Sequence, residues 1–144
     1  MQDIKVYTMA ILQFNSRMSI TLHLGISALI LIPVAVVYGI SPELAMSKLF
    51  DFKVQTVDLK NIVRAIMGLY LAIAACCAIG IFKPGFWVTA TITNIFFMGG
   101  LSAGRLLSLI LDGVPTINFS IGLLLELLLT FWGVWNIRNC KIFT

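Results

Sequence analysis

Four long apolar stretches dominate the chain, and short polar segments separate them. Each stretch has about the 20 residues that an α-helix needs to cross the hydrocarbon core of a bilayer. The pattern predicts an all-α integral membrane protein, with residues 19–144 in a single antiparallel bundle of four transmembrane helices. The predicted spans are residues 19–40, 61–82, 86–111 and 117–137.

The segment before the first span, residues 1–18, mixes Lys5 and Arg17 with apolar side chains. It has no unbroken apolar core followed by a small-residue cleavage site, so its pattern is not that of a cleaved signal peptide. We expect an N-terminal, partly helical arm that lies at the membrane surface.

The only long polar connection covers residues 41–60. It opens with Ser-Pro-Glu at residues 41–43, which suits an N-cap, a first helical residue and a first-turn acid. We predict a short interfacial helix here, between spans one and two. Asp58 or Asn61 is then expected to cap the second span.

The two remaining connections have the composition of tight turns. Residues 83–85 read Lys-Pro-Gly, and residues 112–115 read Asp-Gly-Val-Pro. The first turn makes the third span return antiparallel to the second. The second turn is short, so the fourth span must pack directly against the third.

Composition supports a membrane location and excludes several classes of function. Of the residues, 60% are hydrophobic and 11% are charged, whereas about a quarter are charged in an average soluble domain. The basic residues are scattered singly, which excludes nucleic acid as a partner. One histidine and three cysteines without ligand spacing lead us to expect no metal and no cofactor. No nucleophile lies beside a base, so we expect no catalytic residues and no enzyme.

Polar residues gather on one face of the third span and on one face of the fourth. At 100° per residue, the third-span face contains Asn94, Leu101, Arg105, Ser108 and Asp112. The fourth-span face contains Asn118, Gly122, Glu126, Thr130 and Gly133. A charged side chain within a bilayer needs a partner, so we expect both faces to point into the bundle.

Depth along the helices selects partners for these charges. At 1.5 Å per residue, Arg105 lies about 9 Å below the turn between spans three and four, and Glu126 lies about 14 Å below it. Arg64 enters from the same side, about 5 Å down, where Asp112 is its expected partner. We predict the ion pairs Arg105–Glu126 and Arg64–Asp112, which together form a neutral cluster. Ser108 and Asn94 complete this candidate site, whose role is structural or ligand-binding. For Arg64, an extension to the headgroups is the alternative.

Small residues mark faces where helices can approach closely. We predict helix packing at Gly68, Gly100, Gly104 and Gly122. Gly100 and Gly104 form a small-xxx-small surface that suits a second neighbour, so a homo-oligomer or a larger membrane complex is a possible assembly.

The single histidine, His23, shares a polar stripe of the first span with Ser16, Ser19 and Ser27. Two interpretations stay open: a site built on the histidine, or a packed interface of small residues with the histidine near the headgroups. We prefer the second, because ligand sites rarely rest on one histidine. The topology places His23 on the opposite side of the membrane from the acids.

Lysine and arginine are slightly more frequent on the side of the two termini than on the other side. By the positive-inside rule, we expect both termini to be cytoplasmic. The expected location is the bacterial cytoplasmic membrane.

Three strings carry a family resemblance: RAIMGLYLA at residues 64–72, FMGGLSAGRLLSLILDGVP at residues 97–115, and LLEL at residues 124–127. They resemble the bacterial membrane proteins grouped as domain of unknown function 4345. The match covers about residues 60–138, and the Gly-Arg-x-x-Ser-x-x-x-Asp-Gly-x-Pro pattern is its most specific part. The resemblance implies a small four-helix membrane protein whose signature residues are those selected by depth, and it implies no activity.

Two classes of function remain. The first is a non-enzymatic structural or accessory subunit whose bundle is fixed by the buried Arg/Glu/Asp pairs, and we rank it first because the charges can neutralise one another. The alternative is the binding or transport of a small anion or an amphipathic, lipid-like ligand in a cavity formed by Arg64, Arg105 and Glu126.

Overall fold

The computed structural model describes the backbone of residues 2–50 and 52–139 and the side chains of residues 15–50 and 52–139. This part of the chain contains no strand and five helices, α1 (Gln2–Gly39), α2 (Pro42–Phe50), α3 (Val57–Phe82), α4 (Trp87–Leu111) and α5 (Ile117–Asn139). Four of these helices are long and apolar enough to span a membrane. The chain is an all-α membrane protein with a short helix between spans one and two, as predicted.

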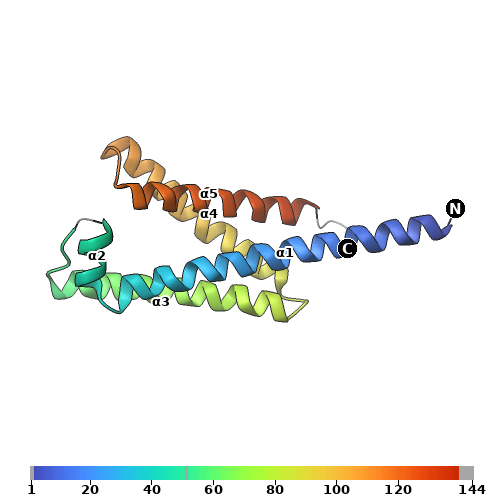
Figure 1. Ribbon diagram of the computed structural model, residues 1–144, viewed down its shortest axis with the longest axis horizontal. Helices are drawn as coiled ribbons and strands as arrows, with labels where there is room; N and C mark the ends of the chain where they lie inside the picture. Colours follow the sequence, from blue (N-terminus) through green and yellow to red (C-terminus); the bar gives the residue numbers. More distant parts are fainter. Residues whose placement is uncertain (1, 51, 140–144) are drawn as a thin grey trace.

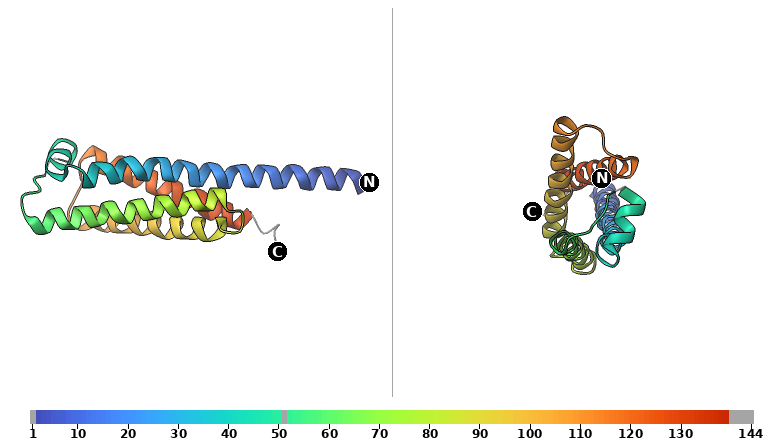
Figure 2. Two further views of the ribbon diagram at one scale, coloured as in Figure 1. Left: turned by 90° about the horizontal axis from the view of Figure 1, so that it is seen from below. Right: turned by 90° about the vertical axis from the view of Figure 1, so that its left-hand side faces the viewer.

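Helix α1 is longer than the predicted first span. Its apolar part covers Asn15–Gly39, and the helix extends back to Gln2 without a break. Figure 2 shows that α1 stays straight over this length. The arm expected over residues 1–18 is therefore continuous with the first span. Pro33 lies inside α1, where a membrane helix tolerates a proline.

Capping residues fix the starts of α2 and α3. Helix α2 starts at Pro42, as the Ser-Pro-Glu run predicts. Helix α3 starts earlier than expected, because Thr56 is its N-cap and the Thr56 hydroxyl accepts a hydrogen bond from the Leu59 backbone N–H (3.1 Å). The prediction that Asp58 or Asn61 caps this helix is wrong. Thr56 precedes both residues and already satisfies a free N–H of the first turn.

The four long helices run antiparallel in chain order (Figure 1). Helix α1 packs along α3, α4 packs against both α3 and α5, and α5 returns against α1. Helix α4 is tilted within this arrangement: it begins beside the end of α3 and moves away from α3 as it approaches the α4–α5 turn, in both Figure 1 and the end view of Figure 2. The bundle is therefore wider at the end where α2 and the α4–α5 turn lie.

The tightest helix crossings occur at glycines that the pattern of small residues did not single out. A Cβ atom at Gly39 would collide with Met67, and one at Gly80 would collide with Ala90. These two glycines let α3 approach α1 at one end of the bundle and α4 at the other.

The predicted packing at Gly68, Gly100 and Gly104 does not occur within one chain, because a Cβ atom at any of them would meet no other atom within 4 Å. A run of small residues identifies a smooth helix face, but it does not specify whether protein or lipid covers that face. Gly122 does face protein, since a Cβ atom there would lie 3.8 Å from the guanidinium carbon of Arg105.

Candidate functional site

The Arg105–Glu126 ion pair joins α4 to α5. The Nε atom of Arg105 is 3.0 Å from each carboxylate oxygen of Glu126 and donates a hydrogen bond to Oε1. The side chains are 22% and 10% exposed, respectively, so the bundle shields most of the pair. Gly122 lies one turn before Glu126 and leaves room for the guanidinium against α5.

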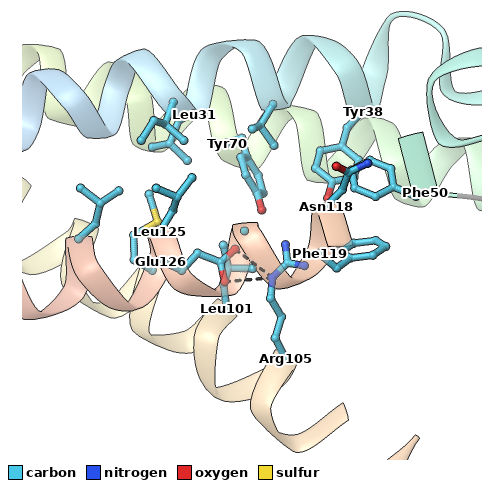
Figure 3. A pocket seen from close by; sticks show the side chains of 15 residues that line it. Leu31, Tyr38, Phe50, Tyr70, Leu101, Arg105, Asn118, Phe119, Leu125 and Glu126 are labelled. Atoms are coloured by element: carbon cyan, nitrogen blue, oxygen red, sulfur yellow. Dashed lines mark hydrogen bonds and ion pairs between the residues drawn. The ribbon is translucent and has the colours of Figure 1, made fainter. Parts of the chain in front are cut away.

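The two terminal nitrogens of Arg105 point away from Glu126, because the pairing uses Nε (Figure 3). The hydroxyl groups of Tyr38 on α1 and Tyr70 on α3 point toward the guanidinium. The ring of Phe119 on α5 lies beside it, with its centroid 5.1 Å from the guanidinium carbon, in the range of a cation–π contact. The guanidinium, carried by α4, is thus surrounded by groups from the other three long helices.

Aromatic contacts extend from this site to α2. Tyr38 stacks on Phe50 with ring centroids 6.0 Å apart, and the centroids of Phe50 and Phe119 are 4.4 Å apart. The Asn118 side-chain amide donates a hydrogen bond to the backbone carbonyl of Leu49. The C-terminal end of α2 therefore covers the site on the side of the polar connection.

Three hollows meet at Arg105. An inner cavity of about 110 Å³ lies between the guanidinium, the two tyrosines and the aromatic rings. A groove of about 500 Å³ lies between α3 and α4, and a second groove of about 580 Å³ lies between α4 and α5. Arg105 and Phe119 line all three hollows, and Gly104 lines both grooves. The grooves have the volume of typical ligand pockets, about 300–1,000 Å³.

The predicted Arg64–Asp112 pair is wrong. Both residues are exposed and no ion pair joins them, while Asp112 accepts a hydrogen bond from the Ser108 hydroxyl (2.8 Å). Equal depth places two residues at one level of the bundle, but α3 and the end of α4 are far apart at this level (Figure 1). Ser108 lines the groove between α4 and α5, and neither Ser108 nor Asp112 lines the inner cavity.

Asn94 belongs to a separate polar cluster, about 16 Å from Arg105 along α4 by helical rise. Its side-chain nitrogen donates to the Ser27 hydroxyl (2.9 Å) and lies 3.3 Å from Nε2 of His23. The same Nε2 atom is 3.0 Å from the backbone oxygen of Leu129. The side chains of His23, Ser27 and Asn94 are fully buried, so His23 lies in a packed interface inside the bundle.

This polar cluster continues along α1 and α5. The Ser19 hydroxyl donates to Oδ1 of Asn136 (2.7 Å) and accepts from Nε1 of Trp132 (3.0 Å). Trp132 packs edge-on against His23, with centroids 5.6 Å apart. Gly133 makes room for the histidine, because a Cβ atom there would lie 3.1 Å from Cε1 of His23. Polar side chains thus join α1, α4 and α5 inside the bundle.

The tyrosines and Phe119 around Arg105 were not identified from the sequence. A signal for Tyr70 was present: it lies about 14 Å below the predicted start of the second span, which is the depth of Glu126. A comparison of depths that includes polar aromatic residues as well as charged ones therefore selects Tyr70 as a neighbour of the pair.

Among the side chains that the structure describes, no three His, Cys, Asp or Glu residues lie close enough to hold a metal ion. The Arg105 site instead presents hydrogen-bond donors, namely guanidinium nitrogens and tyrosine hydroxyls. Such groups suit the binding of a ligand with acceptor oxygens.

A family model described as a domain of unknown function, DUF4345, matches residues 19–137. The chain belongs to the DUF4345 family. The match includes all four apolar spans and both members of the Arg105–Glu126 pair, and it confirms the resemblance seen in the three sequence strings. No curated protein and no solved structure matches this DUF4345 protein.

Proposed function

We propose that this DUF4345 protein is a non-enzymatic membrane protein that binds an amphipathic, lipid-like ligand at the Arg105–Glu126 pair. The observation that carries the proposal is that Arg105 lines the inner cavity and both grooves. A ligand with a polar head and an apolar tail can place its head at the guanidinium and its tail along a groove. Ligand sites are in general apolar hollows with a few convergent polar groups.

We further propose that the pair lies within the bilayer. Helical rise places Arg105 about 9 Å and Glu126 about 14 Å from the α4–α5 turn, between apolar stretches of both helices. A buried pair enclosed by protein alone would serve to fix helix register. The guanidinium of Arg105 also borders two open grooves, which favours access for a ligand from the lipid phase.

Purification in a mild detergent, followed by native mass spectrometry of the retained molecules, tests the binding function. The double variant Arg105→Gln/Glu126→Gln removes both charges and avoids the uncompensated charge that a single change would leave. Arg64→Gln is a matched control, because it removes an exposed charge outside the cavity. The wild type and the control should retain an amphipath that the double variant loses. Equal retention by all three proteins, or no retention by the wild type, would overturn the proposal.

A second candidate function is that of an accessory subunit that packs against a partner or a second copy. It is supported by the α4 face at Gly100 and Gly104, where a Cβ atom would meet nothing within 4 Å and another helix can approach closely. A stoichiometric partner or an oligomer after the same purification would favour this function. A monomer with bound lipid would favour ligand binding.

We also propose a location in the bacterial cytoplasmic membrane, with both termini cytoplasmic. The slight excess of basic residues on the side of the termini supports this orientation. A C-terminal green fluorescent protein should then be fluorescent, and a C-terminal alkaline phosphatase should be inactive. The reverse result would overturn the orientation.

A further inference from the structure

The charge balance around Arg105 identifies a class of ligand, on the premise of the ligand-binding function proposed above. Arg105 and Glu126 are in direct contact, so the pair is neutral as a unit. Arg64, the other base expected here, lies outside the cavity. An anionic head would compete with Glu126 for a guanidinium that is already compensated, and a buried charge without its own counter-ion is costly.

The polar groups that face the inner cavity are mainly donors. The terminal nitrogens of Arg105 carry only N–H groups and point toward the cavity side of the pair (Figure 3). The hydroxyls of Tyr38 and Tyr70 point toward the same guanidinium, and each can donate one hydrogen. The Glu126 carboxylate accepts one hydrogen bond, from Nε of Arg105 to Oε1, while Oε2 lies 3.0 Å from the same nitrogen and accepts no hydrogen bond of its own. An uncharged acceptor, such as an ester or ketone carbonyl, fits both the donors and the neutral charge.

The groove between α3 and α4 is the better place for the tail. It is lined by the two tyrosines as well as Arg105, whereas the groove between α4 and α5 is lined by Arg105 without either tyrosine. Away from the polar end, its walls are apolar or bare backbone, and include Ile62, Ile66, Leu69, Gly100, Leu101 and Gly104. The two glycines keep this face of α4 open.

We infer that the ligand is a neutral lipid that presents a carbonyl oxygen to Arg105 and lays one alkyl tail in the groove between α3 and α4. The inner cavity of about 110 Å³ is large enough for a carbonyl group, because it equals the liquid volume of more than three water molecules at about 30 Å³ each. The alkyl tail then covers the apolar walls of the groove between α3 and α4.

A competition between two probes tests the inference. Methyl palmitate offers a neutral ester carbonyl, and hexadecanesulfonate offers a permanently ionised head on a similar alkyl chain. Detergent-solubilised wild-type protein is incubated with equal amounts of both, and the bound ratio is read by mass spectrometry. The ester should exceed the sulfonate by at least about tenfold, because the ionised head has no counter-charge in the site.

Two variants sharpen the test. Glu126→Gln retains an acceptor for Nε of Arg105 but exposes the guanidinium charge, so the preference should reverse toward the sulfonate. Gly100→Leu places a side chain in the groove between α3 and α4 and not in the other groove; its Cβ atom would meet no neighbouring helix within 4 Å, and the variant should weaken binding of both probes about tenfold or more. Gly68→Leu is the matched control, because it adds the same side chain at an open α3 position that does not line the groove.

The outcomes separate this inference from the proposed function. A wild-type preference for the sulfonate, or an unchanged ester preference in Glu126→Gln, would overturn the neutral head and leave lipid binding intact. Equal binding by Gly100→Leu and Gly68→Leu would overturn the position of the tail. If the wild type bound neither probe and retained no lipid from the cell, the binding function itself would fail.

Discussion

Replacing Arg105 alone and replacing Glu126 alone should each destabilise the protein, and the two losses together should exceed the loss when both residues are replaced. Breaking a fully buried ion pair by removing one partner costs about 3–5 kcal/mol, while replacing both by apolar residues is often neutral. The Arg105 side chain is 22% exposed and its guanidinium contacts the ring of Phe119. Solvent and the ring therefore stabilise part of the guanidinium charge, and the cost of breaking the pair should be lower than for a fully buried pair. We expect about 2 kcal/mol for Arg105→Met and for Glu126→Leu, about 1 kcal/mol for both together, and hence a coupling of about 3 kcal/mol.

The free energy of unfolding can be measured by titrating micelle-solubilised protein with dodecyl sulfate and following helix loss by circular dichroism. The more exposed pair Glu43–Lys60 between α2 and α3 is the control, and its cycle should give a coupling well below that of Arg105–Glu126, because solvent screens surface pairs. If the two single losses add up to the loss of the double variant within about 0.5 kcal/mol, the reasoning is refuted, since each charge would then be stabilised by groups other than its partner.

Two further predictions concern other parts of the bundle. Gly133→Ala should lower the free energy of unfolding by about 1–3 kcal/mol, because the new Cβ atom would lie 2.6 Å from Cγ1 of Ile95 and 3.1 Å from Cε1 of His23. Gly68→Ala, at an open helix position, should be neutral or slightly stabilising, and equal effects in the two variants would contradict the packing argument. A hydrogen bond from Lys60 lowers the pKa of Glu43 below its ordinary value, so the stabilisation from this ion pair is fully present above the ordinary glutamate pKa of about 4.3 and is lost as the pH falls through the lowered pKa. Hydrogen exchange of α2 amides should show this acid-range weakening in the wild type and lack it in Glu43→Gln.

The sequence was a good guide to the spans and to one ion pair. Hydrophobic length determines where a membrane helix can begin and end, and α4 and α5 lie within two residues of their predicted bounds. A comparison of depths was enough to predict the Arg105–Glu126 pair, because the short turn already makes α4 and α5 neighbours. The same comparison failed for Arg64 and Asp112, because depth along a helix contains no information on the lateral distance between helices.

The tilt of α4 explains why Asn94 and Arg105 lie in separate polar clusters. Asn94 and Arg105 share one helix face, and a helix parallel to its neighbours would present both residues to the same partner. Because α4 crosses the bundle (Figure 1), this face meets Ser27 of α1 at one level and Glu126 of α5 at another. Periodicity predicts which residues share a face, and it does not predict which neighbour that face meets at each level.

The length of α1 has a consequence for the surroundings of the protein. The helix has 38 residues and is therefore about 57 Å long, whereas the hydrocarbon core of a bilayer is about 30 Å thick and the headgroups extend it to about 40–45 Å. A straight rod of this length that crosses the membrane must project into the aqueous phase. The part before Asn15 adds about 20 Å of helix beyond the apolar span, long enough to hold a group attached to it clear of the headgroups.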